Sequence, residues 1–332
     1  MIDFLITWVD GHDPIWMKER NHYAALAHNE IDVDEIRYRN WENLRYWFRG
    51  VEKFAPWVNK IFFVTCGHLP EWLNTGHPKL EIVNHSDFIP AEYLPTFNSN
   101  VIELYFHRIK GLSEQFVYFN DDMFLIDSVL PSRFFRRGLP CDKGGFTIHP
   151  RNGMFGTAVY LAIQLINAHF NKKETVLKAL PKWFTLRYPR QSLRSLLYAS
   201  IKRNEFLGFF DPHLPQGYLK DTYEEVWANC SEDLIRTSKS HFRQYGDVTS
   251  WLLRYWQLAS NTFFPYNTSN DGQFYFLDKR NIAEIIDCIR HQRKKIVCLN
   301  DMAETTVFDY LKNEILTALE SILPDKCTFE LS

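Results

Sequence analysis

The stretch that most constrains the fold is residues 115–126, an apolar run interrupted at its centre by Asn120, Asp121 and Asp122. Such a run is typical of a strand buried on both faces, as in a parallel sheet covered by helices. Unpaired carboxylates are costly to bury, so Asp121 and Asp122 require a positive charge or contact with water. A divalent cation is one solution, and hard oxygen ligands favour Mg²⁺ or Mn²⁺ over Zn²⁺. The alternative is a turn at the strand end with both aspartates solvated.

Strand-like runs alternate with helical patterns through the first part of the chain. This order predicts an α/β fold, a Rossmann-like and mostly parallel sheet flanked by helices and joined by right-handed crossovers. After about residue 150 the pattern changes to helices and irregular segments, which predicts a helical insertion in the second half. The predicted strands are residues 2–9, 60–65, 80–83, 115–126 and 295–299, and the predicted helices include residues 40–54, 97–109 and 304–323.

Composition excludes some classes of protein. The chain has 332 residues and a net charge of -2, so no overall positive charge draws it to nucleic acid. Its six cysteines are scattered without a Cys-x-x-Cys pair, which fits reduced thiols in a reducing compartment. The sequence has neither a signal-peptide pattern nor a stretch of about 18 apolar residues. We therefore predict a cytoplasmic protein, and leave open its peripheral attachment to the inner face of the cytoplasmic membrane.

Residues 178–204 are rich in basic and aromatic side chains and contain no acidic residue. One hypothesis is a surface that binds anionic lipid or a phosphate-bearing polymer. The alternative, and the commoner arrangement, is a solvated helix whose apolar stripe packs on the core. That stripe consists of Leu193, Leu196, Leu197 and Ile201.

Polar side chains follow three of the predicted strands. Asp10 follows the first, Asp121 and Asp122 interrupt the acidic one, and Asn300 and Asp301 follow the last. Open α/β sheets bind ligands beyond the carboxyl ends of their strands. Provided that the late strand joins the same sheet, these side chains predict a site for a metal and a nucleotide diphosphate.

The sequence around these positions resembles the Stealth family of hexose-1-phosphoryltransferases. The resemblance to its third conserved region is looser than the others, residues 141–210 match no part of the family pattern, and Lys110 stands where proline is expected. Residues 2–11 (IDFLITWVDG) resemble the first region, residues 39–125, including YFNDDMFL at 118–125, the second, residues 212–215 and 240–250 the third, and residues 296–301 the fourth.

The resemblance implies transfer of a sugar 1-phosphate from a nucleotide sugar, commonly UDP-linked, to an acceptor sugar hydroxyl. The reaction would form a phosphodiester in capsule or exopolysaccharide synthesis, release UMP and depend on Mg²⁺ or Mn²⁺. The expected partners are the nucleotide-sugar donor and a glycan or lipid-linked saccharide acceptor, with no nucleic acid. Three alternatives stay open: a metal-dependent glycosyltransferase that releases UDP, a two-metal nuclease or phosphatase, and a non-catalytic sugar-binding protein.

We also predict a division of the chain into three parts. Residues 1–140 would form the nucleotide-sugar-binding α/β part, and residues 141–255 a mostly helical acceptor or regulatory part. Residues 256–332 would return a strand and a helix to the α/β core.

Two residues are expected to act on the transferred group. The resemblance singles out His213 among the twelve histidines as the general base, a role that suits an imidazole, and His85, at a predicted strand end, is the second candidate. Arg243 is expected to clamp phosphate oxygens through its planar guanidinium group.

The remaining roles concern the metal and the donor. Asp121 and Asp122 are the predicted metal ligands, and Asp301 is a further one. Asp121 is also predicted to be a catalytic residue. Gly11 would allow a close approach of the backbone, and the N–H groups that open the helix at Asn98 and Ser99 would face phosphate; the alternative is that these two residues only cap the helix. The predicted substrate-binding residues are Trp8, Asp10, Gly11, Asn98, Ser99 and Asn300.

Overall fold

A five-stranded sheet forms the centre of the structure, a computed structural model that describes residues 1–27, 31, 38–202 and 204–331. The strand order is β3-β2-β1-β4-β8, in which the first four strands run parallel and β8 runs antiparallel to β4. The α/β prediction is therefore confirmed. The strands are β1 (Ile2–Thr7), β2 (Ile61–Thr65), β3 (Leu80–Asn84), β4 (Gln115–Phe119) and β8 (Gln216–Leu219).

Both faces of this sheet are covered, which explains its almost continuously apolar strands. Successive side chains of a strand point to opposite faces. Accordingly, Phe4 and Ile6 of β1 belong to one apolar cluster and Leu5 to the other. The first cluster includes α2 (Leu44–Phe54), α10 (Ile282–Arg290) and α11 (Phe308–Ile322), and the second includes α3 (Ser99–Leu104), α4 (Gly153–His169), α8 (Lys220–Ser238) and α9 (Trp251–Ala259).

The acidic run is two strands, not the single strand that the sequence predicted. β4 ends at Phe119, and β5 (Met123–Leu125) begins after a turn closed by a hydrogen bond from the Met123 N–H to the Asn120 carbonyl, at 3.2 Å. The polar residues of this turn mark the place where the chain leaves the main sheet. They therefore lie at a strand end and not within a strand.

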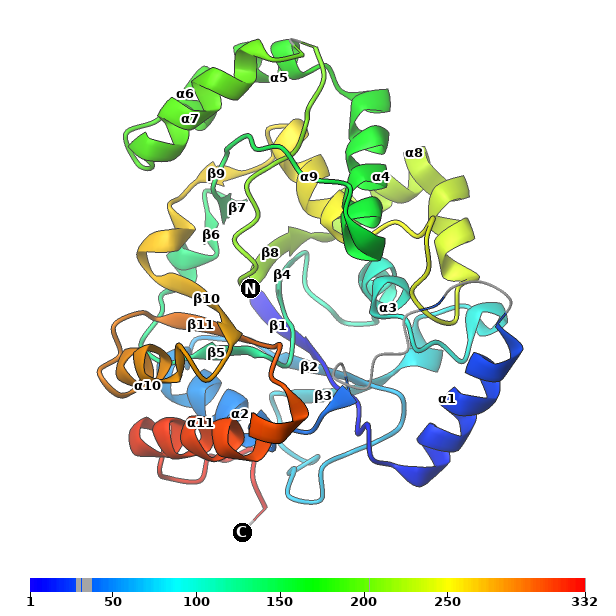
Figure 1. The fold of residues 1–332 in the computed structure, drawn as a ribbon, viewed down its shortest axis with the longest axis vertical. Coiled ribbons are helices and arrows are strands. Elements are labelled where there is room, and N and C mark those ends of the chain that lie inside the picture. The colour runs from blue at the N-terminus through cyan, green and yellow to red at the C-terminus, as the bar shows by residue number, and fades with distance from the viewer. Residues whose placement is uncertain (28–30, 32–37, 203, 332) are drawn as a thin grey trace.

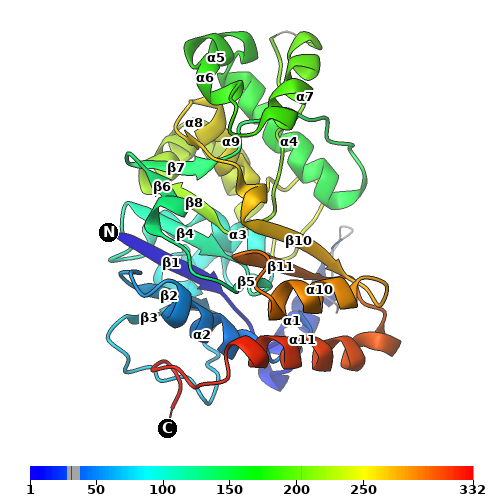
Figure 2. The ribbon, with the colours of Figure 1, turned by 90° about the vertical axis from the view of Figure 1, so that its left-hand side faces the viewer.

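The late strand β11 (Ile296–Asp301) does not join the main sheet. The three polar strand ends therefore do not lie at the edge of one sheet, as the predicted site required. Strand β11 lies in a second sheet, between β10 (Gly272–Leu277), to which it is parallel, and β5, to which it is antiparallel. The second sheet begins where β4 ends, because the chain passes from β4 of the main sheet directly into β5 of the second sheet (Figures 1 and 2). The acidic turn thus connects the two sheets.

Residues 153–200 are mostly helical, as predicted for the second half of the chain. The outer helices of this insertion lie at one end of the molecule, away from the main sheet (Figure 1). None of the helices among the described residues is long and apolar enough to cross a membrane. The remaining elements are α1 (Pro14–Leu26), α5 (Lys172–Lys178), α6 (Leu180–Trp183), α7 (Pro189–Ser200), β6 (Phe135–Arg136), β7 (Leu139–Asp142) and β9 (Phe264–Pro265).

The predicted helices differ from the observed ones mainly at their ends. The predicted helix 97–109 is shorter in the structure, where α3 is followed by a separate 3-10 turn at Phe106–Arg108. The predicted helices 40–54 and 304–323 correspond to α2 and α11, which begin four residues later.

Asp3 fixes the central strand to its surroundings. Its buried carboxylate accepts hydrogen bonds from Asn59 Nδ2 at 2.7 Å, the Lys60 N–H at 3.2 Å and the Ser113 N–H at 2.7 Å. These donors precede β2 and β4, so a single carboxylate joins the starts of three strands.

We predict that Asp3→Asn lowers the free energy of unfolding by about 1–3 kcal/mol, because an amide presents a donor where the site supplies only donors. Urea denaturation measures the change. The control is Glu81→Gln, which removes a half-exposed ion pair with Lys60 and is expected to change stability by less than about 0.5 kcal/mol. Equal midpoints for the native chain and Asp3→Asn would contradict this role.

Candidate functional site

Asp122 is held at the junction of the two sheets with part of its carboxylate unpaired. Its backbone carbonyl accepts a hydrogen bond from the Leu299 N–H at 2.8 Å, and its Oδ2 accepts one from Asn300 Nδ2 at 3.3 Å. Its Oδ1 is buried and has no hydrogen-bond partner among the residues that the structure describes. An unpaired buried carboxylate oxygen is costly, which indicates that a positive group normally faces it.

Asp121 adds a second negative charge to the same turn. Its side chain reaches solvent, but the protein packed around it and the neighbouring charge of Asp122 raise the pKa of Asp121 to about 7. Two carboxylates this close repel each other, and a cation between them would favour the charged form of both.

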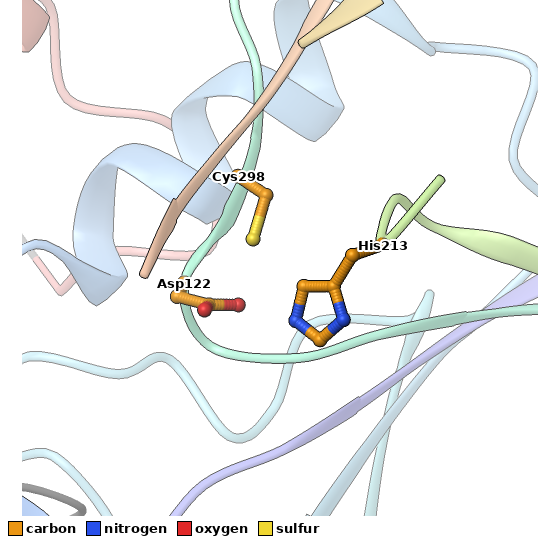
Figure 3. Close-up of side chains that lie close together, drawn as sticks. All are labelled: Asp122, His213 and Cys298. Atoms are coloured by element: carbon orange, nitrogen blue, oxygen red, sulfur yellow. The ribbon is translucent and has the colours of Figure 1, made fainter. Parts of the chain in front are cut away.

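His213 comes from a distant part of the chain to meet this turn. Single ligand atoms of Asp122, His213 and Cys298 all lie within 4.8 Å of one another (Figure 3). The backbone of His213 has a φ of 46°, a conformation that a residue with a side chain adopts rarely and at a cost. Its ring packs edge-on against Phe274, with centroids 5.0 Å apart. The imidazole is therefore directed to the acidic turn by a constrained backbone.

An open cleft of ≈ 360 Å³ lies beside His213. It is lined by residues 210–214 from the histidine loop and by Ser269 and residues 272–274 from the start of β10 and the segment before it. A volume of this size accommodates a small polar ligand such as a sugar phosphate.

The donor set at the turn fits a hard cation through its oxygen atoms. Cys298 is fully buried, and Mg²⁺ does not select a soft sulfur ligand. Burial, the charge of Asp122 and a hydrogen bond from the thiol to Asp122 raise the pKa of Cys298 well above its ordinary value, so the thiol keeps its proton beside Asp122. Carboxylate oxygens of Asp121 and Asp122 are therefore the groups suited to Mg²⁺ or Mn²⁺, and the imidazole stays available for proton transfer.

A buried ion network holds the loop that carries His213. Arg254 is fully buried, and its guanidinium donates to Asp142 Oδ2 at 2.7 Å and to Asp211 Oδ1 at 2.5 Å. Asp211 Oδ2 also accepts a hydrogen bond from the Tyr255 hydroxyl at 2.6 Å. Asp211 lies two residues before His213, so Arg254 fixes the approach of the histidine to the turn.

Arg243 is linked to the strand ends through a second buried network. Its guanidinium donates to Ser99 Oγ, and its positive charge lies close enough to oppose the rise in the pKa of Glu103 that burial causes. Glu103 accepts a hydrogen bond from the Tyr118 hydroxyl at 3.2 Å, and that hydroxyl is also 3.2 Å from Thr7 Oγ1. The network thus runs from Arg243 to the carboxyl ends of β4 and β1.

Asp301 is engaged away from the Asp122 cluster. Its carboxylate accepts hydrogen bonds from Trp41 Nε1 at 3.1 Å and from the Ala303 N–H at 2.9 Å, and Arg39 lies 3.6 Å from it. The reason is its place on β11, two residues beyond the Leu299 N–H that bonds to the acidic turn. A metal-ligand role for Asp301 stays a prediction.

Asn98 and Ser99 have roles inside the protein. Asn98 is fully buried and caps α3, because its Oδ1 accepts a hydrogen bond from the Asn100 N–H at 3.1 Å. Its Nδ2 donates to Asp247 Oδ2 at 2.9 Å. Ser99 is the partner of Arg243. Contact of either residue with a substrate stays a prediction.

The residues that follow β1 lie beside the end of β4, because Ile6 pairs with Phe119. Trp8 stacks on the core residue Phe63, with ring centroids 5.8 Å apart. Asp10 is about one-third exposed, and its Oδ1 accepts a hydrogen bond from the His12 N–H at 3.0 Å.

Gly11 allows a close approach of backbone, but the neighbour is the protein itself. A Cβ atom at this position would lie 2.1 Å from the Tyr38 carbonyl oxygen. The glycine is therefore required by packing against Tyr38, and its contact with a nucleotide stays a prediction.

His85 is poorly suited to be the general base. It follows β3 at the edge of the main sheet, two strands away from β1 and three from β4. Burial and the nearby His68 lower the pKa of His85 to about 4, so its neutral imidazole is a weak base.

The sequence interpretation did not single out Glu103, Asp211, Arg254 or Cys298. Asp211 could have been noticed as an acidic residue directly before the Pro212-His213 pair. Glu103 and Arg254 lie in apolar helical segments, where a charged residue signals a buried partner but does not identify it.

Comparison with known proteins identifies relatives of this chain. The sequence model described as Stealth protein CR2, conserved region 2, matches residues 37–141, which contain the acidic turn. The capsular polysaccharide phosphotransferase WcwK of Streptococcus pneumoniae is 39% identical over 331 residues, covering 99% of this chain and 98% of that protein. The receptor polysaccharide phosphotransferase WefC of Streptococcus oralis is 37% identical over 336 residues, covering 99% of each chain.

Among solved structures, the galactosyltransferase LgtC in complex with donor and acceptor sugar analogues has a TM-score of 0.40 and 13% identity, covering 94% of this chain and 95% of that chain. This is only a loose likeness of architecture. The full-length relatives and the matched conserved region are decisive, and they confirm the resemblance seen in the sequence. The chain belongs to the Stealth family of polysaccharide phosphotransferases.

Proposed function

We propose that this protein transfers a sugar 1-phosphate from a UDP-linked sugar to an acceptor sugar hydroxyl, forms a phosphodiester in capsule or exopolysaccharide synthesis, and releases UMP. The observation that carries the proposal is the convergence of His213 with the Asp121–Asp122 turn beside an open cleft. Its relatives named as polysaccharide phosphotransferases support the choice of reaction.

His213 acts as the general base. It takes the proton of the acceptor hydroxyl as that oxygen bonds to the phosphorus next to the sugar. The bond between this phosphorus and the bridging oxygen of the pyrophosphate then breaks, and UMP leaves with that oxygen. The loop fixed by Arg254 and Asp211 keeps the imidazole in position for this transfer.

Asp121 and Asp122 would hold Mg²⁺ or Mn²⁺, with Asp301 as a further ligand. The cation, when bound, supplies positive charge that neutralises the pyrophosphate and stabilises the leaving nucleotide. The unpaired Oδ1 of Asp122 supports this assignment.

Arg243 binds phosphate oxygens through a planar group that lysine cannot reproduce. The predicted donor contacts from Trp8, Asp10, Gly11, Asn98, Ser99 and Asn300 belong to this proposal, and Asn300 is the one that contacts the Asp122 carboxylate. Ser99 orients Arg243, which is the contribution that its geometry supports best.

The three predicted parts keep their proposed roles. Residues 1–140 bind the nucleotide sugar, residues 141–255 serve the acceptor, and residues 256–332 complete the α/β core with β11 and α11. The partners are the nucleotide-sugar donor and a glycan or lipid-linked acceptor. The reaction takes place in the cytoplasm.

The product distinguishes this proposal from its nearest rival, a metal-dependent glycosyltransferase. We predict that the protein, incubated with a panel of UDP-sugars, Mg²⁺ and a saccharide acceptor, releases UMP, which chromatography separates from UDP. Attack at the anomeric carbon would instead release UDP, and that product would contradict the proposed phosphorus attack.

Substitution of either turn carboxylate is expected to abolish transfer without unfolding the protein. Asp121→Ala and Asp122→Ala each remove a charge that would bind the cation, so both activity and Mn²⁺ binding measured by calorimetry should fall. Asp325→Ala, at an exposed position, is the matched control and should match the native chain. Near-normal turnover in either turn variant would exclude that residue from the metal site.

His213→Ala is expected to lower kcat by about 10²–10⁴-fold with a modest change in donor KM, because a positioned base contributes about that much. Steady-state kinetics at saturating donor measure it, with exposed His291→Ala as the control. If kcat is unchanged in His213→Ala, another group takes the proton.

A further inference from the structure

The outer helix α7 has the opposite orientation to that of an ordinary surface helix. The residues that it buries are polar, Gln191 and Ser195, whereas its leucines point outward. A surface helix normally packs its apolar stripe on the core and leaves its polar side in water. The commoner alternative considered for this segment, a stripe that packs on the core, is therefore wrong.

Specific hydrogen bonds explain why the polar side faces inward. Ser195 Oγ accepts a hydrogen bond from the Phe146 N–H at 3.0 Å, and Gln191 Nε2 donates to the Phe146 carbonyl at 3.1 Å. Both backbone groups of Phe146 are satisfied by α7. The orientation of the helix is thus fixed by bonds that an apolar inner face could not make.

The exposed apolar surface extends beyond one helix. Leu193, Leu196 and Leu197 of α7 expose 66%, 54% and 68% of their surface. Single exposed leucines are common, but several on adjacent turns of one helix usually mark a contact surface. We call this group the leucine surface; its other exposed members are Leu177, Leu180, Leu186 and Ile201.

Basic side chains border the leucine surface. Arg190 and Arg194 are exposed on α7, one turn apart, on the same side of the helix as Leu197. The sequence has no acidic residue between Glu174 and Glu205. Among the residues of this segment that the structure describes, the other exposed basic ones are Lys178, Arg187 and Lys202, of which Lys202 pairs with Glu205.

We propose that the leucine surface docks the protein on a membrane that contains anionic lipids. Leucines along the exposed side of a helix can enter the boundary between head groups and acyl chains, while arginines beside them contact lipid phosphates. A soluble phosphate polymer would use the arginines and leave the leucines without a partner. A second copy of this chain would present the same positive charge to itself.

The position of the surface agrees with this assignment. Figure 1 shows α5, α6 and α7 together at the end of the molecule farthest from α11. They lie apart from β4 and β5, the strands that the acidic turn connects (Figure 1). The inference goes beyond the proposed reaction, because it concerns where the protein binds and not what it transfers.

Sedimentation of the full-length chain with vesicles tests the proposal without any measurement of activity. The vesicles are phosphatidylcholine alone or phosphatidylcholine with phosphatidylglycerol. The test variant combines Leu193→Gln, Leu196→Gln and Leu197→Gln, which keep good helix formers at exposed positions. The control combines Leu69→Gln, Leu130→Gln and Leu331→Gln, which are exposed elsewhere on the protein.

We expect the native chain to bind vesicles that contain phosphatidylglycerol and to bind pure phosphatidylcholine more weakly. The test variant should lose at least about tenfold in affinity, and the control should bind like the native chain. Arg190→Gln with Arg194→Gln should weaken binding and reduce its dependence on salt. Circular dichroism establishes that each variant is folded.

Three results would overturn the proposal. The first is equal vesicle binding by the native chain and the leucine variant. The second is no vesicle binding, together with a dimer in light scattering that the leucine variant dissociates, which assigns the surface to a second copy. The third is no vesicle binding, together with binding of inorganic polyphosphate that the arginine variant alone weakens, which assigns it to a phosphate polymer.

Discussion

The structure depends on one constraint, the placement of two carboxylates at a turn between two sheets. β4 delivers Asp121 and Asp122 out of the main sheet, and β11 holds the turn through the Leu299 N–H and Asn300. One oxygen of Asp122 is left buried without a hydrogen-bond partner in the described part of the chain. A fold that buries such an atom gives up stability there, and this cost is typical of a site that binds a charged ligand.

Two buried hydrogen-bond networks hold the groups around the turn in place. Arg254 joins Asp142 of β7 to Asp211, so the helical insertion supports the loop that carries His213. Glu103 joins Tyr118 of β4 to the region of Arg243. The two groups proposed to act on the phosphate thus come from the second half of the chain, and buried ions hold both against strands of the first half.

Sequence patterns predicted the local features and missed those that depend on long-range pairing. The buried apolar runs identified the parallel strands, because both faces of the sheet are covered. Periodicity could not reveal that the acidic run is two strands in different sheets, because a turn of polar residues within an apolar run leaves the spacing of the run almost unchanged. Nor could it show that Asp301 bonds to Trp41 or that His213 meets Asp122, since both contacts join segments far apart in sequence.

The orientation of α7 is a second feature that the sequence pattern could not predict. Its sequence has the amphipathic pattern of a core-packed helix, yet two hydrogen bonds to the backbone of Phe146 reverse it. Pattern alone identifies the faces of a helix but not the neighbour that each face meets.

The central claim is that Asp121 and Asp122 bind a cation against a pyrophosphate. Calorimetric measurement of the UDP dissociation constant with and without Mn²⁺, in the native chain and in Asp122→Asn, tests it most directly, because coupled binding sites change each other's affinity. We expect Mn²⁺ to tighten UDP binding by at least about tenfold in the native chain and much less in Asp122→Asn. The same effect of Mn²⁺ in both proteins would contradict it.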